Sequence, residues 1–448
     1  MSMELAAESA EAPSKFWRRQ PLGDVVDILD SRRVPVNASE REKRLGNVPY
    51  YGATGQVGWI DQALFEEELV LLGEDGAPFL EPTRAKAYLV VGKAWVNNHA
   101  HVLRGKEGLL NRFLVHQLNQ VDYRGFVSGS TRLKLPQGTM KQIMLVVPPL
   151  PEQQRIVAEI EKQLTRLEAG VAALRRAQAN LKRYRAAVLK AACEGRLVPT
   201  EAELARREGR EYESGEQILA RTLQAVPQSK GTPAPGSASD LPALPEGWTW
   251  ATFQQLSKRV TVGHVGPMKH EYVAEGVPFL RSQNIRPGRF DPDGLLHIRR
   301  EFHSKLAKSV VRPGDLAVVR SGSVGVTCVI PESLGEANCS DLVLIQGPRA
   351  LNPYFGAYYM NSIARRRVEA GKVGVALTHF NTKAVAAMPV PLPPLAEQHR
   401  IVAEVERRLS VIEELEAAVA ANLARAARLR QAILQRAFSG QLVAPAPA

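Results

Sequence analysis

A segment of about fifty residues occurs twice in this chain, and the second copy lies 245 residues after the first. The first copy begins Pro-Pro-Leu-Pro-Glu-Gln-Gln-Arg-Ile-Val-Ala-Glu at 148–159, and the second begins Pro-Pro-Leu-Ala-Glu-Gln-His-Arg-Ile-Val-Ala-Glu at 393–404. The offset holds without a gap to the ends of the copies, Gly-Arg-Leu-Val at 195–198 and Gly-Gln-Leu-Val at 440–443. Because each copy closes one half of the chain, the sequence consists of two units in tandem.

Both copies have apolar residues at spacings of three and four, a pattern typical of a helix that packs against another helix. A Pro-Pro pair blocks helix before each copy, and Gly195 and Gly440 are suitable C-terminal caps. We therefore predict long helices at 151–198 and 395–443. The residues expected to pair the two helices are Ile160, Leu164, Leu167, Val171, Leu174, Val405, Leu409, Ile412, Val419 and Leu423.

The charges of the two predicted helices indicate how they pair. The first helix is acidic in its first half and basic in its second, with net charges of −1 over 152–174 and +6 over 175–196. The second has the same polarity, with −3 over 397–419 and +4 over 420–440. Antiparallel packing places each acidic half beside a basic half, whereas parallel packing places like charges together. We expect an antiparallel coiled coil, with Gln178 near Glu416 in a centred register.

The remaining sequence divides into two compact domains and three connecting or terminal segments. Residues 15–150 and 245–394 contain short apolar runs broken by Gly, Pro and Asn, which predict strands and tight turns. We expect an α+β fold with two similar globular domains, each followed by a long helix. Residues 1–14 are predicted to be disordered, 199–244 to form a linker with a charged, helix-compatible first part, and 444–448 to form a tail.

Composition excludes several classes of protein. The sequence has no run of about 18 apolar residues and no basic-then-apolar signal at its start, so we expect a soluble, cytoplasmic protein without membrane contact. Three cysteines without a C-x-x-C pair argue against disulfide and zinc frameworks. A net charge of +12 favours a polyanionic partner such as nucleic acid, although charge alone is also compatible with general solubility.

We find no pattern of residues that indicates catalysis. Asn352-Pro353-Tyr354-Phe355 lacks the second proline of an adenine methyltransferase loop and follows no glycine-rich cofactor loop, so we interpret it as the start of a helix. The Gly-Lys pairs lack the other residues of a phosphate loop, and the nine histidines are scattered. We predict no catalytic residue, no metal site and no cofactor on this chain.

Polar and basic residues gather instead in the glycine-rich turns of both domains. Arg, Asn and Gln can bind base edges, and Ser, Thr and Lys can hold phosphates, so these turns are candidate DNA contacts. The alternative is that they are ordinary solvated turns. The candidates in the first domain are Tyr51, Thr54, Gln56, Asn97, Asn98, His99, Ser130, Arg132 and Lys134. The candidates in the second domain are Arg281, Gln283, Asn284, Arg320, Ser321, Lys372, His379 and Asn381.

The whole arrangement resembles the specificity (S) subunits of type I restriction-modification systems. The resemblance rests on Pro-Pro-Leu-x-Glu-Gln-x-Arg-Ile-Val-Ala-Glu-x-Glu at 148–161 and 393–406 and on the Gly-x-Leu-Val ends. Leu-Pro-Glu-Gly-Trp-Thr-Trp at 244–250 also resembles the start of that family's second target-recognition domain. Two copies of the motif at this spacing, with a different domain before each, make the resemblance specific.

The resemblance implies a function without catalysis in this chain. Each compact domain would be a target-recognition domain that reads one half of a split sequence in double-stranded DNA. The helix pair would set the spacing and dock two methyltransferase (M) subunits, which would supply S-adenosylmethionine and adenine methylation. Restriction (R) subunits, where the system has them, would add ATP, Mg and DNA cleavage. The alternatives are a modification enzyme with its own unrecognised catalytic site and a coiled-coil adaptor that binds no DNA.

Overall fold

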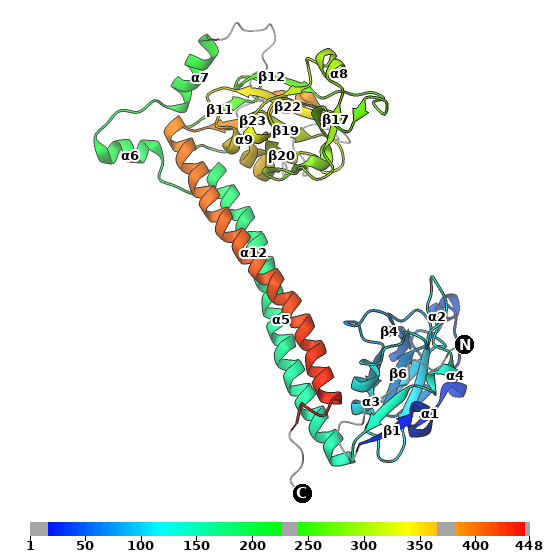
Figure 1. Cartoon of the computed structure of the whole chain (residues 1–448). Helices are drawn as coiled ribbons and strands as arrows, with labels where there is room; N and C mark the ends of the chain where they lie inside the picture. The colour runs from blue at the N-terminus through cyan, green and yellow to red at the C-terminus, as the bar shows by residue number, and fades with distance from the viewer. Residues whose placement is uncertain (1–16, 226–240, 365–380, 444–448) are drawn as a thin grey trace. The chain divides into compact units, whose positions relative to one another are not determined.

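The structure of the chain is a computed structural model, and it describes residues 17–225, 241–364 and 381–443. These residues form two compact units. The first contains residues up to 177 together with those from 418 onward, and the second contains residues 178–417. Each unit holds one globular domain and one part of each long helix (Figure 1). Among the described residues no helix is long and apolar enough to cross a membrane.

The first globular domain contains three small sheets. β1 (Arg18–Pro21) pairs antiparallel with β10 (Met144–Val147). An antiparallel sheet has the order β2 (Val26–Ile28), β9 (Ala100–Gly105), β6 (Leu69–Gly73) and β7 (Ala87–Val90). A further sheet has the order β4 (Gly55–Ile60), β3 (Val48–Gly52), β8 (Lys93–Val96) and β5 (Phe65–Glu66), in which β3 and β8 run parallel. The helical elements are α1 (Leu22–Val25), η1 (Asp30–Arg32), α2 (Ala38–Lys43), α3 (Asn111–Leu118) and α4 (Gln137–Met140).

The second globular domain repeats this plan. β11 (Thr249–Thr252) pairs with β23 (Pro389–Leu392), and an antiparallel sheet has the order β12 (Ser257–Val262), β22 (Leu342–Pro348), β19 (Leu316–Val319) and β20 (Thr327–Val329). The last main sheet has the order β13 (Tyr272–Val273), β17 (Leu296–Ile298), β14 (Val277–Leu280), β21 (Ala337–Cys339) and β18 (Val310–Val311), with β14 and β21 parallel. The shorter elements are β15 (Ile285–Arg286), β16 (Arg289–Phe290), η3 (Ser282–Asn284), α8 (Arg300–Lys305), η4 (Glu332–Leu334), α9 (Pro353–Tyr359), η5 (Met360–Ala364) and α11 (Thr382–Ala386).

Equivalent side chains hold equivalent parts of the two domains together. Gln153 is fully buried, accepts a hydrogen bond from the Leu110 amide and donates to the carbonyls of Gly108 and Pro148. Gln398 makes the same three contacts in the second domain, with Asn352, Ala350 and Pro393. Because a buried amide side chain without partners would be costly, both copies of the Glu-Gln motif anchor a long helix to its own domain.

The long helices are α5 (Leu150–Cys193) and α12 (Leu395–Phe438), each of 44 residues. In the first unit, Ile160 and Leu164 near the start of α5 share a core with Ile433 and Leu434 near the end of α12. In the second unit, Val188 near the end of α5 shares a core with residues at the start of α12. The helices therefore run antiparallel and side by side, as predicted (Figure 1).

The ends of the long helices agree with the sequence expectation to within a few residues. Gly195 and Gly440 follow them with φ of +66° and +72°, a backbone conformation that favours glycine. The Arg196 amide donates to the carbonyl of Ala191 over 2.9 Å, which completes a Schellman cap. Residues after 193 and 438 therefore belong to the caps, although the predicted helices extended to 198 and 443.

Ion pairs fix the register of the helices. Arg430 contacts Glu168 at 3.1 Å in the first unit, and Arg185 contacts Glu416 at 3.1 Å in the second. The expectation that Glu416 lies near Gln178 is therefore corrected, because its partner is Arg185, two helical turns further along α5. The Arg185 guanidinium crosses the interface between the two helices and neutralises the Glu416 carboxylate, whereas the neutral amide of Gln178 would not.

The linker expected at 199–244 is shorter in the structure. It contains α6 (Glu201–Glu208) and α7 (Gly215–Gln224), whose N-termini are capped by Thr200 and Ser214. Ile218 of α7 is buried in the core of the second unit. The capping boxes and this apolar contact give the first half of the segment a fixed structure, and residues 226–240 lie outside the described part.

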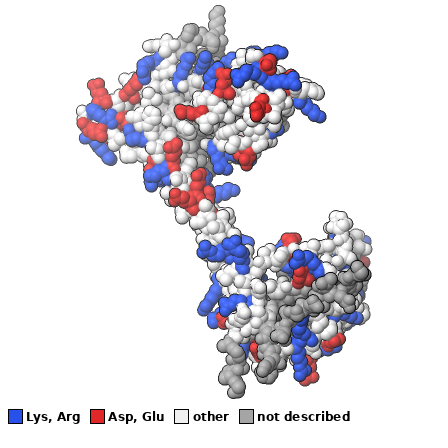
Figure 2. All heavy atoms as spheres, viewed as in Figure 1, with Lys and Arg blue, Asp and Glu red and all other residues white. Residues whose placement is uncertain are grey.

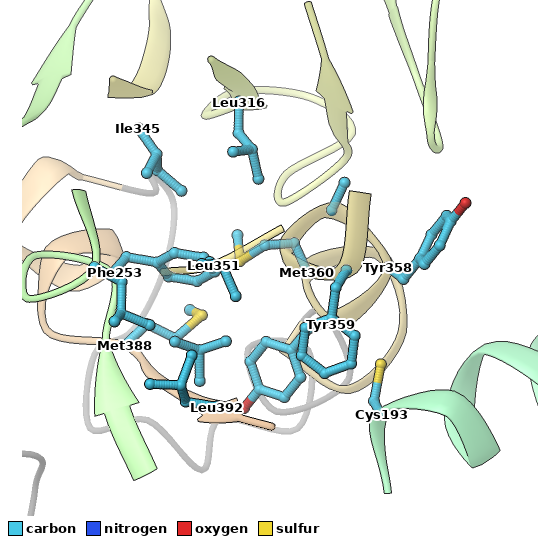
Figure 3. Packing of buried hydrophobic residues seen from close by; sticks show 14 of the residues in the cluster. Cys193, Phe253, Leu316, Ile345, Leu351, Tyr358, Tyr359, Met360, Met388 and Leu392 are labelled. Atoms are coloured by element: carbon cyan, nitrogen blue, oxygen red, sulfur yellow. The ribbon is translucent and has the colours of Figure 1, made fainter. Parts of the chain in front are cut away.

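The core of the second unit joins its globular domain to both long helices. Side chains from β19, β22, α9 and β23 meet Cys193 at the end of α5 in one apolar cluster (Figure 3). The aromatic rings of Phe253 and Tyr359 and the thioether of Met388 lie in the same cluster. Cys193, Cys328 and Cys339 are free, buried thiols.

Candidate nucleic-acid interface

The polar turns of the first domain meet at one end of its antiparallel sheet. The loop after β6, residues 74–76, and the loop before β9, residues 97–99, continue two paired strands, because Gly73 is opposite Ala100 in the ladder. We call these the rim loops of domain 1. The amides of Glu74 and Asp75 both donate to the carbonyl of His99, at 2.8 and 3.3 Å. These bonds hold the two loops side by side.

A groove of about 690 Å³ lies beside the rim loops. Four of the predicted DNA-contacting residues line it: Thr54, Asn97, His99 and Arg132. The structure thus brings together side chains from three separate turns of the sequence. Its lining also includes Asp75, a carboxylate that the sequence analysis does not include among the candidates.

Asp75 is the centre of the polar contacts at this groove. Its Oδ1 lies 2.6 Å from Nε of Arg132, and its Oδ2 lies 3.4 Å from Nδ1 of His99. Nη2 of Arg132 also lies 3.4 Å from Nδ1 of His99, and the role of that nitrogen depends on the tautomer of the ring. Asp75 therefore fixes the direction of the Arg132 guanidinium, which itself remains more than half exposed.

A buried ionic network lies next to the rim loops. His101, which is only 1% exposed, contacts Oδ2 of Asp30 at 2.6 Å through Nδ1 and the carbonyl of Leu135 at 2.8 Å through Nε2. A carbonyl can only accept a hydrogen bond, so Nε2 is the donor to Leu135. Burial raises the pKa of Asp30, but its bonds to His101 and the Val102 amide outweigh burial and lower the pKa below the usual value.

Asp30, Glu74 and His101 are close enough together to be metal ligands by geometry. However, Nη1 of Arg33 lies 2.6 Å from Oε2 of Glu74, and Nη2 lies 3.4 Å from Oδ2 of Asp30. The guanidinium therefore contacts the oxygen atoms that a metal ion would need. The geometry favours a salt-bridge network that supports the rim loops over a metal site.

The other candidates of domain 1 differ in exposure and in partners. Asn97 is buried and its Oδ1 accepts from the His99 amide at 2.8 Å, so it shapes the turn that presents its neighbours. Tyr51 is half-buried and packs against the ring of Tyr88. The exposed candidates are Thr54, Gln56, Asn98, Ser130, Arg132 and Lys134, of which Lys134 contacts Glu74 at 3.4 Å.

The second domain places polar residues at the equivalent end of its own antiparallel sheet. Val319 is opposite Leu342 in the ladder, so the rim loops of domain 2 are residues 320–322 and 340–341. Nη1 of Arg320 lies 3.3 Å from Oδ1 of Asp341, and the Ser321 hydroxyl donates to Oδ2 of Asp341 at 3.3 Å. Asp341 has a φ of +39°, a conformation that Asp tolerates better than most residues.

A second polar group in domain 2 surrounds Gly294. Arg281 and Gln283 both donate to the carbonyl of Gly294, at 3.0 and 3.3 Å. Asn284 is fully buried and holds the loop through the Arg281 amide and the carbonyl of Asp291. Asn381, which the sequence analysis predicts as a DNA contact, caps α11 by accepting a hydrogen bond from the Ala384 amide. The candidates Lys372 and His379 lie outside the described residues.

Sequence reasoning missed the two aspartates because it searched for groups that bind DNA directly. Asp75 follows β6 and Asp341 precedes β22, and each contacts a predicted arginine. Their signal in the sequence is an acidic residue at the end of an apolar strand, and many solvated turns share that signal. Figure 2 shows acidic and basic side chains interspersed over both units in the view shown. Charge alone therefore does not mark these sites.

Comparison with known proteins gives the context for this geometry. Residues 15–173 match the sequence model of the type I restriction modification DNA specificity domain. A Haemophilus influenzae protein assigned as the type I restriction enzyme specificity subunit S.HindORF215P is 27% identical over 403 residues, which cover 87% of this chain and 86% of that protein. The type I restriction enzyme EcoDI specificity subunit of Escherichia coli is 24% identical over 437 residues, covering 96% and 89%.

The fold is also similar to a solved structure. A chain in a structure described as the basis of complex assembly and conformational transition of the type I R-M system matches with a TM-score of 0.64. The match covers 96% of this chain and 99% of that chain at 19% sequence identity. At this identity the likeness concerns the fold, namely two α+β domains with long helices.

Proposed function

We propose that this chain, which belongs to the specificity subunits of type I restriction-modification systems, binds double-stranded DNA at a sequence made of two separated halves. Each globular domain reads one half through the loops at the end of its antiparallel sheet. The observation that carries the proposal is that one scaffold occurs twice with different polar residues on its rim loops. Two domains with the same fold but different side chains on their loops can recognise two different base sequences.

The antiparallel helix pair sets the distance between the half-sites in this proposal. Each helix has 44 residues, which corresponds to roughly 66 Å at about 1.5 Å per residue. The apolar seam and the cross-helix ion pairs Glu168–Arg430 and Arg185–Glu416 support a stiff element. A stiff element is needed because a flexible connection would not favour one spacing over another.

The helices also offer a surface for two methyltransferase (M) subunits. In the second unit Tyr184, Val411 and Leu415 are each close to half exposed, although they lie on helices that bury other apolar residues. Exposed apolar side chains on an ordered helix surface are typical of an interface with another protein. S-adenosylmethionine would bind to the M subunits, and ATP and Mg to R subunits where the system has them.

The chain itself would be non-catalytic, and its place would be the cytoplasm, where DNA is accessible. The rival proposal is a modification enzyme with its own active site. Purified chain incubated with S-adenosylmethionine and duplex DNA distinguishes the two, because methyl transfer without an M subunit would support the rival. We expect transfer only after M subunits are added.

Adenine-methylation mapping tests the DNA-reading function directly. Genomes of a host strain with and without this gene are sequenced for methylated adenine, with the M subunit gene present in both strains. We expect a two-part motif with a fixed gap that disappears with the gene. Methylation that is identical in both strains would contradict the proposal.

Salt dependence separates DNA binding from a coiled-coil adaptor that binds no DNA. The affinity of the chain for duplex DNA should fall steeply between about 50 and 200 mM salt if several phosphates are neutralised. Absence of duplex binding at low salt, by the chain alone and by the chain with M subunits, would support the adaptor instead.

A further inference from the structure

The rim loops of the two domains occupy the same place in the fold and can be aligned by strand register. In domain 1 the paired residues Gly73 and Ala100 end the ladder, and the next residues beyond the sheet are Glu74 after Gly73 and His99 before Ala100. In domain 2 the residues that follow the pair Val319 and Leu342 are Arg320 and Asp341. The alignment uses hydrogen-bond partners alone, so it does not depend on similarity of the side chains.

The charges at this place are rearranged between the domains. The first rim loop of domain 1 provides the carboxylate of Asp75, whereas the first rim loop of domain 2 provides the guanidinium of Arg320. The result is nevertheless the same kind of pair: Asp75 contacts Arg132 at 2.6 Å, and Asp341 contacts Arg320 at 3.3 Å. Each domain thus has an arginine held by an aspartate at the same end of its sheet, although the residues come from different positions of the fold.

An arginine whose guanidinium is held in one direction is well suited to binding guanine. The guanidinium can donate two parallel hydrogen bonds to O6 and N7 of guanine in the major groove, and this pairing needs a defined direction of the planar group. A carboxylate on one side of the guanidinium fixes that direction and leaves other N–H groups for the base. In domain 2 the Arg320 side chain is 25% exposed and its Nε is buried without a hydrogen-bond partner among the described residues, so only the exposed part of the guanidinium can reach a base.

We propose that Asp75 and Asp341 are positioning residues that hold Arg132 and Arg320 for two-bond donation to a guanine, one guanine in each half-site. This rests on the proposed function and adds the base class and two residues to it. The aspartates touch the arginine and not the DNA. They therefore act on selectivity for the base, and their negative charge opposes the general attraction of the surface to phosphates.

Because the aspartate charge weakens general DNA binding but supports base selectivity, its removal should change the two in opposite directions, which a merely structural role would not reproduce. Asp75→Asn and Asp341→Asn remove one negative charge beside the DNA. Each variant should bind random-sequence duplex more tightly than the unmodified chain, while its preference for guanine at one position falls by about tenfold. Damage to the fold would instead weaken both kinds of binding.

The experiment selects bound sequences from a duplex library with random positions, using the full chain together with its M subunits. The unmodified protein should yield a two-part motif with guanine in each half. Asp75→Asn should lose the guanine in one half only, and Asp341→Asn in the other half only. Arg132→Lys and Arg320→Lys should give the same losses, because lysine keeps the charge but not the planar fork.

Matched controls remove a charge from other ion pairs of the same domains. Asp122→Asn breaks the exposed pair with Arg124, and Glu336→Gln breaks the exposed pair with Arg312. Both should leave the selected motif unchanged. If the unmodified chain selects a two-part motif that the aspartate variants keep, or a motif without guanine, the positioning role is wrong. If it selects no two-part motif, the proposed function fails.

Discussion

The spacing role of the helix pair is tested by shortening both helices at facing positions. Removing 170–173 from α5 and 425–428 from α12 takes four residues from each helix. The ion pairs Glu168–Arg430 and Arg185–Glu416 lie on either side of the deletion and set its register. Because the two removed segments face each other in this register, both ion pairs and both apolar ends can form as before.

The expected change follows from helix and DNA geometry. Four residues shorten a helix by about 6 Å and turn it by about 40° beyond a full rotation. One base pair of DNA rises about 3.4 Å, and at about 10.5 base pairs per turn it rotates by about 34°. Translation therefore favours a gap shorter by about two base pairs, and rotation favours about one. We expect the gap to shorten by one or two base pairs, with both half-sites unchanged.

A seven-residue deletion provides the contrast. Removing 170–176 and 422–428 shortens the pair by about 10.5 Å, which corresponds to about three base pairs. Seven residues return the helix to within about 20° of its starting direction, whereas three base pairs turn the DNA by about 100°. Length and rotation then disagree, so we expect methylation to be lost rather than shifted by three base pairs.

Mapping of methylated adenines in strains that carry each variant measures these outcomes. Thermal unfolding and co-purification with the M subunits show whether each shortened chain folds and assembles. A four-residue variant that still methylates the original motif with the original gap would refute the spacing argument. A seven-residue variant that methylates with a gap three base pairs shorter would show that rotation is not limiting.

Three further predictions concern individual buried groups. Gln153→Ala removes three buried hydrogen bonds and should lower the free energy of unfolding by about 2–3 kcal/mol in urea titrations, whereas the exposed Gln154→Ala should change it by less than about 0.5 kcal/mol. Asp30→Asn should lower the free energy of unfolding by about 3 kcal/mol at pH 7. Because the pKa of Asp30 is lowered from 3.8 in the folded chain, the stabilisation by its carboxylate is complete above that value and is lost as the pH falls through the lowered pKa. Urea titrations should therefore show a smaller difference in stability between the unmodified chain and the variant at pH 3 than at pH 7. Burial raises the pKa of Cys193 and Cys328 to about 12, so neither thiol should react with a thiol reagent at pH 8 before unfolding, and rapid labelling of the native chain would contradict their burial.

The long helices were predictable because their signals are local and redundant. Apolar spacing, the proline pair before each start and the glycine near each end together indicate that both helices exist and place their boundaries to within a few residues. The antiparallel direction was also predictable, because it depends on the net charge of whole half-helices and not on individual contacts. The partner of Glu416 was not predictable, since a shift of two turns leaves those net charges almost unchanged.

The polar sites were less predictable because they join residues that are distant in the sequence. Asp30 and His101 are 71 residues apart, and their contact depends on the pairing of β2 with β9. The sequence indicated a helix-compatible first part of the linker, but its packing against the second domain was not predictable for a different reason. Its composition is polar, and its order comes from the capping boxes and from one buried side chain, Ile218.

The two copies separate residues that maintain the scaffold from residues that differ with the target. Gln153 and Gln398 make the same contacts in both copies, since a side chain without both a donor and an acceptor would leave buried backbone groups unpaired. The strand ladders place the rim loops at the same end of each sheet, yet both the side chains and the loop backbones differ, because Asp341 has a φ of +39° whereas its register equivalent His99 has a negative φ. A shared scaffold that carries different loops is what the reading of two different sequences requires.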